Sequence, residues 1–98
     1  MKFEFVKDRM MMLDEEGKQM GFITFPALKK DLVNIERVWT APEYRGQGVA
    51  AQMMEALFAE LERQDKKAVL TCPYAQKYMM KNPQWEHLLP KNIKFEKI

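Results

Sequence analysis

The sequence predicts one domain of the mixed α/β class, built on a mostly antiparallel sheet that carries one long helix. Three observations support this prediction. Short alternating apolar segments fill residues 2–40, residues 47–64 repeat apolar side chains at three- and four-residue steps, and residues 67–71 form another apolar run. A strand, a helix and a second strand in succession form a unit with parallel strands. We therefore expect one parallel pair beside antiparallel hairpins.

The first 40 residues predict strands joined by short turns. Residues 2–13 read as one bent strand or two consecutive strands. Residues 14–17 have turn chemistry because three acidic residues precede a glycine, and residues 20–25 complete a hairpin. We expect residues 27–32 to form a polar connection. Residues 33–40 alternate without a purely apolar face, which suggests that one face of this strand meets a ligand.

The most regular pattern in the sequence is the helical repeat of residues 47–64. Its polar face carries glutamine, glutamate and arginine, and its apolar stripe should cover the sheet. A second, shorter helix is expected over residues 74–80, ended by Asn82 and Pro83, and residues 92–98 could form a last strand. The apolar positions of the long helix are Val49, Ala50, Met53, Met54, Ala56, Leu57, Phe58 and Leu61.

Length and composition set limits on function. The 98 residues suffice for a single domain over residues 1–98, and a composition of 47% hydrophobic and 31% charged residues is typical of globular proteins. We expect no signal peptide, because acid lies within the first residues, and no membrane segment. A single cysteine cannot form an internal disulfide, and no Cys/His cluster indicates a metal site. These features favour a cytoplasmic protein.

The charge balance gives no reason to invoke a nucleic-acid partner. The net charge is +2, and the two signs are mixed along the chain. A basic bias that an acidic ligand could use is visible only late, at Lys77, Lys81, Lys91, Lys94 and Lys97.

Residues 38–50 predict a strand, a tight loop and a helix start. The first N–H groups of a helix have no partner within it, and the helix dipole adds partial positive charge there. Gly46 and Gly48 allow close approach to the backbone, and Arg45 adds a positive charge, so we expect a phosphate or pyrophosphate. The spacing of the glycines excludes both the P-loop and the dinucleotide fingerprint.

Residues 45–50, Arg-Gly-Gln-Gly-Val-Ala, resemble the Arg/Gln-x-x-Gly-x-Gly/Ala signature of the Gcn5-related N-acetyltransferases. The preceding residues 35–44 are similar to the strand and loop that lead into this signature. The resemblance extends to Cys72-Pro73-Tyr74 and Tyr78, and so covers roughly residues 20–85. It points to a small, single-domain branch, although Trp39 stands where many relatives in that branch have histidine.

This resemblance implies a fold, a ligand and its contacts. The fold would be the family's mixed, mostly antiparallel twisted sheet, with the parallel strands that end at Thr40 and Thr71 splayed apart to admit acetyl-CoA. The strand end at residues 38–40 would pair with the amide arm of coenzyme A, and the N–H groups of residues 47–50 would hold its pyrophosphate. The residues expected to contact coenzyme A are Val38, Trp39, Thr40, Arg45, Gly46, Gln47, Gly48, Val49, Ala50, Cys72, Tyr74, Lys77 and Tyr78.

The resemblance also suggests three catalytic candidates. Cys72 precedes a predicted helix, whose dipole favours the thiolate that attacks a thioester, although a buried inert cysteine is an equal alternative. Glu36 could remove a proton from the incoming amine or be an ordinary surface glutamate. Tyr78 shares a helical face with Tyr74, and its hydroxyl could protonate the leaving thiolate, contact coenzyme A or simply pack. His87 is expected to have a structural or exposed role.

The leading functional interpretation is an acetyl-CoA-dependent N-acetyltransferase acting on an amine that the sequence does not identify. Transfer would be direct, with Glu36 as base, or would pass through Cys72. One alternative is a coenzyme A-binding module without turnover, such as a sensor or partner subunit. Another is a structural domain whose glycine-rich loop merely turns the chain. The expected assembly is a monomer or a homodimer.

Overall fold

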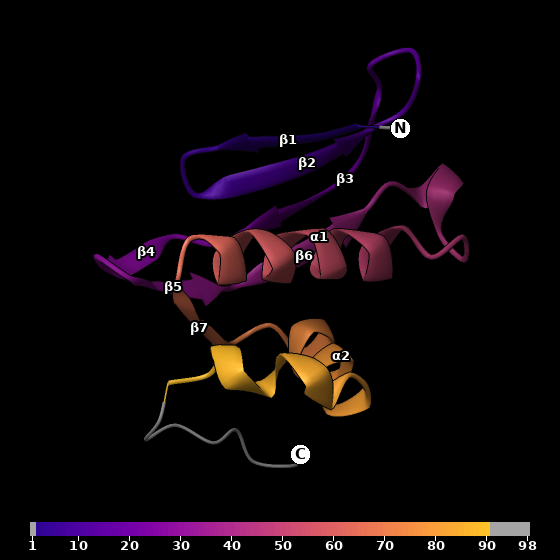
Figure 1. Ribbon diagram of the computed structural model, residues 1–98. Helices are drawn as coiled ribbons and strands as arrows, with labels where there is room; N and C mark the ends of the chain where they lie inside the picture. Colours follow the sequence, from indigo (N-terminus) through magenta and orange to yellow (C-terminus); the bar gives the residue numbers. More distant parts are fainter. Residues whose placement is uncertain (1, 91–98) are drawn as a thin grey trace.

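The computed structural model describes residues 2–90 and shows two small sheets packed against one long helix (Figure 1). One sheet has the strand order β1-β2-β3-β6 and the other has the order β4-β5-β7. Within the described residues, β5 and β7 are the one parallel pair. The predicted fold class is thereby confirmed. The strands are β1 (Lys2–Val6), β2 (Arg9–Leu13), β3 (Gln19–Thr24), β4 (Ala27–Lys29), β5 (Leu32–Ile35), β6 (Arg37–Thr40) and β7 (Lys67–Leu70).

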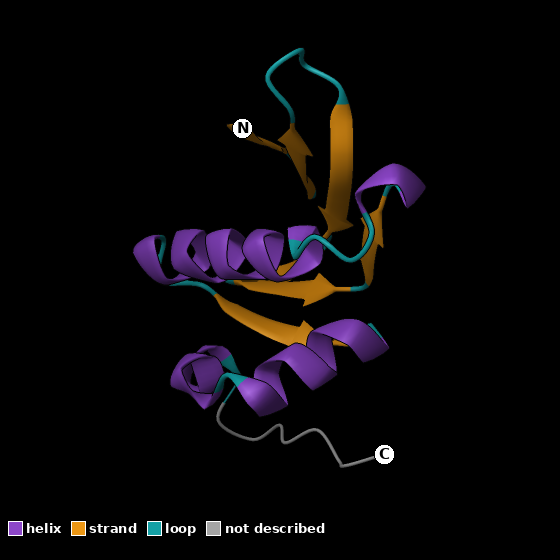
Figure 2. Cartoon of the chain, turned by 90° about the vertical axis from the view of Figure 1, so that its right-hand side faces the viewer, coloured by secondary structure: helices purple, strands orange, loops and turns teal. Residues whose placement is uncertain are grey.

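Two tight hairpins build the first sheet, and the turn chemistry of residues 14–17 predicts the second of them. Residues 2–13 form two strands, joined by a turn in which Asp8 adopts a positive φ of 67°. The turn between β2 and β3 projects from the sheet (Figure 2). There the Asp14 carboxylate accepts the backbone N–H groups of Glu16 and Lys18 at 2.9 and 2.8 Å, and Gly17 takes a φ of 85°.

The predicted continuous strand over residues 33–40 breaks at Glu36. Val33 and Ile35 are buried in β5, whereas Val38 packs on the core from β6, so the inward-facing positions change from odd to even numbers. A strand cannot keep both sets inward without a break, because side chains alternate with a period of two. As a result β5 pairs with β7, while β6 pairs with β3.

The polar connection predicted for residues 27–32 is wrong in part, because it contains the strand β4 (Ala27–Lys29). All three side chains of β4 are exposed, and the strand pairs only with β5 among the described strands. Edge strands of this kind are held by backbone hydrogen bonds rather than by an apolar face. The sequence therefore carries no alternation that would indicate it.

The long helix α1 (Val49–Arg63) forms the centre of the core. It contacts β2, β3, β6 and β7, and it starts two residues after the predicted position. Gly21 of β3 allows close approach of the helix to the sheet, since a Cβ there would lie 2.5 Å from the carbonyl oxygen of Trp39 and 2.9 Å from the Met53 methyl group. The buried residues of α1 are Val49, Met53, Met54, Leu57, Phe58 and Leu61.

The C-terminal part packs on α1 through aromatic rings. The helix α2 (Pro73–Lys81) lies close to the predicted boundaries, whereas the 3₁₀ segment Pro83–Leu88 that follows Asn82 was not predicted. The Phe58 ring lies 6.0 Å from Tyr78 and 5.7 Å from Trp85, centroid to centroid. None of the helices in residues 2–90 has the length and apolar character needed to span a membrane. The last strand expected over residues 92–98 lies outside the described residues.

The close approach at Gly21 predicts the effect of a single added methyl group. Gly21→Ala would force its Cβ against a backbone oxygen and the end of Met53, and overpacking of this kind costs about 1–3 kcal/mol. Urea denaturation should show a lower free energy of unfolding for this variant. A transition midpoint equal to that of the parent would contradict the packing described here.

Candidate active site

The site begins at the loop between β6 and α1. After Thr40 the chain makes a 3₁₀ turn, Pro42–Tyr44, and then reverses through Gly46 and Gly48, whose φ values are 81° and 80°. Positive φ strongly favours glycine at both positions. A Cβ added at Gly46 would have no neighbouring atom within 4 Å. One added at Gly48 would approach only the Gln52 side-chain amide, at 3.9 Å. The outer surface of the loop is therefore open.

The first turn of α1 presents free N–H groups to that open surface. Its N-cap is Gly48, which has no side chain to cap the helix, and no hydrogen bond within residues 2–90 takes the N–H groups of residues 49–51. Uncapped N–H groups and the helix dipole together form an anion site. A hollow of about 240 Å³ lies here, lined by Thr40, Tyr44, Arg45, Gly46, Gly48, Val49, Ala50, Ala51 and Tyr74.

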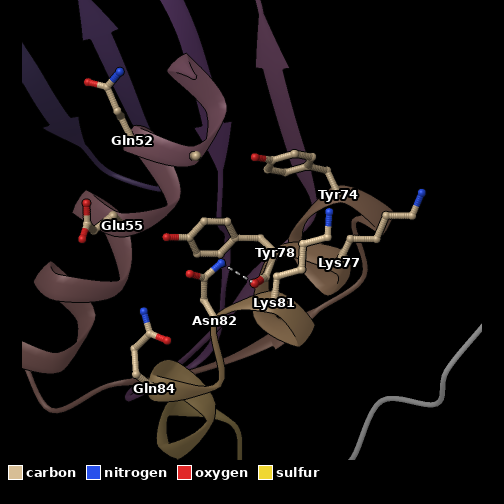
Figure 3. Close-up of a pocket in the computed structure, with 9 residues that line it drawn as sticks. Gln52, Glu55, Tyr74, Lys77, Tyr78, Lys81, Asn82 and Gln84 are labelled. Atoms are coloured by element: carbon tan, nitrogen blue, oxygen red, sulfur yellow. Dashed lines mark hydrogen bonds between the residues drawn. The ribbon is translucent and has the colours of Figure 1, made fainter. Parts of the chain in front are cut away.

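A second, larger hollow of about 510 Å³ lies between α1 and α2 (Figure 3). It shares Ala51 and Tyr74 with the first hollow, so the two are adjacent. Figure 3 shows Gln52 and Glu55 on α1 across from the tyrosines and lysines of α2. The lining residues are Ala51, Gln52, Glu55, Tyr74, Lys77, Tyr78, Lys81, Asn82 and Gln84.

The two parallel strands beside these hollows, β5 and β7, separate after Ile35, and we call this point the fork. The carbonyl oxygen of Ile35 accepts the N–H groups of both Thr71 and Cys72, at 3.1 and 3.2 Å, and this is where the β5–β7 pairing ends. Beyond it, β6 follows β3 while the other strand turns into α2. The parallel pair therefore does separate, but its first member is β5 rather than the strand that ends at Thr40.

Comparisons with known proteins agree with this geometry. The sequence profile of the GCN5-related N-acetyltransferases matches residues 9–88. This chain belongs to the GCN5-related N-acetyltransferase family. Among curated proteins it is similar to protein NATD1 of Gallus gallus, with 38% identity over 64 residues that cover 62% of this chain and 58% of that protein. The human protein NATD1 is 36% identical over 59 residues, which cover 60% of this chain and 52% of that protein. The matches thus span a little over half of these relatives.

Solved structures show the same fold. A GCN5-like protein from Staphylococcus aureus superposes with a TM-score of 0.74 at 18% identity, covering 97% of this chain and 90% of that one. An acetyltransferase of the family from Elizabethkingia anophelis, solved with acetyl-CoA bound, superposes with a TM-score of 0.60 at 13% identity. The superposition covers 76% of this chain and 51% of that one. The fold of this small family member is therefore that of known acetyltransferases.

Of the predicted coenzyme A contacts, most meet at the two hollows. Thr40, Arg45, Gly46, Gly48, Val49, Ala50 and Tyr74 line the smaller one, and Tyr74, Lys77 and Tyr78 line the larger. Val38, Trp39, Gln47 and Cys72 line neither. Val38 packs on the core, the Trp39 ring stacks on Phe22, and the Gln47 amide donates to the Glu43 carbonyl oxygen at 3.1 Å.

Several lining residues are not among those predicted from the sequence. Tyr44 and Ala51 flank the loop, and the larger hollow adds residues from both helices. The helical spacing carried a signal for some of them, because residues three or four apart share a helix face. Gln52 and Glu55 are related in this way on α1, and on α2 Lys81 lies four residues after the predicted contact Lys77.

The three predicted catalytic residues lie in different surroundings. The Cys72 side chain belongs to the hydrophobic core, with 7% of its surface exposed. Glu36 is exposed at the fork, where its carboxylate accepts the Thr24 hydroxyl at 3.4 Å. Tyr78 lines the larger hollow with Tyr74 one turn before it, and burial raises the pKa of both phenols.

Two contacts tie the loop to the projecting hairpin turn. The Tyr44 hydroxyl donates to the Asp14 carboxylate at 2.7 Å, and the Lys18 ammonium lies 2.8 Å from the Glu43 carboxylate. The hydrogen bond with Tyr44 is the main cause that lowers the pKa of Asp14, and the bond with Asp14 raises the pKa of Tyr44. We call the Asp14–Tyr44 and Lys18–Glu43 pairs the loop latch.

Breaking the loop latch should weaken anion binding without removing it. Tyr44→Phe deletes one hydrogen bond while keeping the ring, so the affinity for coenzyme A should fall about 2- to 10-fold. Isothermal titration calorimetry with coenzyme A measures this, and pantetheine, which lacks the diphosphate, is the control ligand. Equal losses for both ligands would contradict a specific role for the loop latch.

The pKa shifts predict the pH range over which the loop latch acts. Asp14 has a lowered pKa when folded, so its contribution is complete above the usual carboxyl value of about 3.9 and is lost only as the pH falls through the folded value. Tyr44 has a raised pKa, so its contribution is complete below about 10 and is lost above that. The affinity ratio of parent to Tyr44→Phe should therefore stay constant between about pH 5 and 9. A ratio that falls toward one within this range would refute this prediction.

Proposed function

We propose that this protein transfers the acetyl group of acetyl-CoA directly to a primary amine. The observation that carries the proposal is the uncapped start of α1, reached through two positive-φ glycines and flanked by Arg45. Such a site suits a diphosphate. It lies beside a fork in the sheet and beside a second hollow large enough for part of a nucleotide.

Each part of acetyl-CoA has a matching feature. The N–H groups of residues 49–51 and Arg45 would hold the diphosphate. Lys77 and Lys81, in the larger hollow, would offset the charge of the nucleotide phosphate. The pantetheine arm would then run past Thr40 toward the fork. Membership of the acetyltransferase family supports this assignment.

The proposed chemistry balances without a covalent enzyme intermediate. The amine nitrogen attacks the thioester carbonyl carbon, the C–N bond forms, and the C–S bond breaks to release coenzyme A as a thiolate. Glu36, exposed at the fork, would accept the proton that the amine loses. A tyrosine would give a proton to the thiolate. Tyr74 suits this role better than Tyr78 because it lines both hollows, and its raised pKa keeps the phenol protonated.

The surroundings of Cys72 favour direct transfer over the route through a cysteine carrier. Its side chain is buried among core residues and lines neither hollow. With only 7% of the residue surface exposed, Cys72 offers a thioester little access to its sulfur atom. The position of this cysteine is that of a small apolar residue before α2, which is common for free cysteines.

The diphosphate site predicts the effect of a negative charge at Gly48. Gly48→Glu should reduce the affinity for acetyl-CoA roughly 10-fold or more in calorimetry, because a carboxylate would face the phosphates. Gly48→Ala is the matched control, since it adds the same backbone strain without the charge, and a Cβ fits there. If the parent does not bind acetyl-CoA, or if both variants bind alike, the proposed site is wrong.

The two transfer routes predict opposite results for two substitutions. Glu36→Gln should lower kcat about 10²–10⁴-fold with little change in acetyl-CoA affinity, whereas Cys72→Ala should keep its activity. Release of coenzyme A thiol measures turnover, and intact mass after incubation with acetyl-CoA detects any acetyl-enzyme. An acetyl group on Cys72 together with an inactive Cys72→Ala variant would overturn direct transfer. Binding of acetyl-CoA without turnover for any amine would indicate a silent coenzyme A-binding module instead.

A further inference from the structure

The face of the first sheet that points away from α1 carries a set of side chains that the proposed cofactor site does not use. The strand register places two rows of side chains on this side of the sheet. Met11, Phe22 and Trp39 form one row across β2, β3 and β6. Arg9, Thr24 and Arg37 form another row, two residues further along each strand. The alternate residues, such as Ile23, face the core and α1. We call this outward side the far face.

An aromatic pair forms the middle of the far face. The rings of Phe22 and Trp39 stack with centroids 5.3 Å apart and an interplanar angle of 27°. The Arg9 guanidinium lies 4.7 Å from the centroid of the Phe22 ring. Both rings are only partly buried. They therefore offer a shelf on which an apolar or aromatic group could rest.

Charged and polar groups border this shelf at the fork. The break at Glu36 brings two consecutive side chains to the far face. Arg37 is there by its register with Thr24, and Glu36 is there because its carboxylate accepts the Thr24 hydroxyl at 3.4 Å. On the neighbouring strands, the Thr71 hydroxyl donates to the Asn34 amide oxygen at 3.0 Å. Carboxylate and guanidinium thus stand side by side where the sheet opens.

The charges of this border are not neutralised in pairs. In the part of the chain that the structure describes, Arg9, Arg37 and Glu36 form no salt bridge. The border therefore offers one carboxylate and two guanidinium groups to a ligand. A diamine or polyamine would be repelled by the guanidinium groups, whereas a ligand with both an amine and a carboxylate would match the set.

We propose that the acceptor is an amino acid, or a similar small molecule whose primary amine lies next to a carboxylate, with an apolar or aromatic side chain. This inference rests on the proposed acetyl transfer and names its acceptor class. Glu36 receives the amine, Arg37 binds the carboxylate, and the side chain lies on the Phe22–Trp39 shelf. Arg37 is then a specificity-determining residue, because it senses a group that takes no part in the transfer.

A series of amines that differ only in the carboxylate tests this proposal. Coenzyme A release would be measured with phenylalanine, phenylalaninamide and phenethylamine. The parent should favour phenylalanine by about 10-fold or more in kcat/KM, which is the range of one charge-assisted hydrogen bond. Arg37→Gln should remove this preference by raising KM for phenylalanine with little change in kcat, and should leave the amide unaffected.

Arg63→Gln is the matched control, since Arg63 is an exposed arginine on α1 that pairs with Glu60, away from the far face. It should keep the preference of the parent. Equal use of the acid and the amide by the parent, or a preference that survives Arg37→Gln, would overturn the assignment of the acceptor class.

A binding measurement separates this inference from the proposed function. Titration with N-acetylphenylalanine, followed by the NMR signal of the Trp39 indole, reports occupancy of the far face without turnover. A shift that disappears in Arg37→Gln while turnover is absent would support the acceptor site and count against the acetyl transfer. No shift in the parent would overturn the acceptor site, whatever the activity.

Discussion

The proposed site is built around the N-terminus of α1, which is uncapped and accessible. Most helices satisfy their first N–H groups with a serine, threonine, aspartate or asparagine side chain. Here the cap is Gly48, which contributes no side chain and adopts a positive φ that makes room for the loop before it. The free N–H groups have a cost in stability unless water or a ligand meets them. That cost is consistent with a site kept for an anion.

Two sets of contacts hold the loop in this open form. On the inner side, Gly21 lets α1 lie close to β3, which fixes the start of the helix relative to the sheet. On the outer side, the loop latch joins the residues before Arg45 to the β2–β3 turn, about thirty residues earlier in the sequence. Packing therefore positions the helix that follows the loop, and polar contacts hold Glu43 and Tyr44 within the loop.

The sequence predicts this framework well, for physical reasons. The apolar repeat of α1 is long, the turn residues at Asp14 and Gly17 have few other conformations, and the glycines of the loop have a clear backbone role. All three signals are local. They depend on residues within a few positions of each other, so one sequence is enough to read them.

The features that the sequence alone does not show depend on contacts between distant residues. The break at Glu36 results from β5 and β6 joining different sheets, and β4 is held only by the backbone of its neighbour. Trp39 faces away from the hollow because of the register with Phe22. Cys72 follows a buried strand and belongs to the hydrophobic core, although Tyr74, two residues later, lines the site. The sequence of residues 33–40 did contain a signal for the break, because the apolar side chains that pack in the core change from odd-numbered positions at Val33 and Ile35 to an even-numbered position at Val38.

The first backbone amides of α1 are the proposed centre of ligand recognition, so a test of the site should follow their NMR signals. In a titration of the ¹⁵N-labelled protein with coenzyme A, the amide resonances of Val49, Ala50 and Ala51 should show the largest shifts. Adenosine 3′,5′-bisphosphate, which has phosphates but no pantetheine arm, should shift residues of the larger hollow, and pantetheine alone should leave the three amides unchanged. If coenzyme A binds while these three amide resonances do not shift, the open start of α1 is not the diphosphate site.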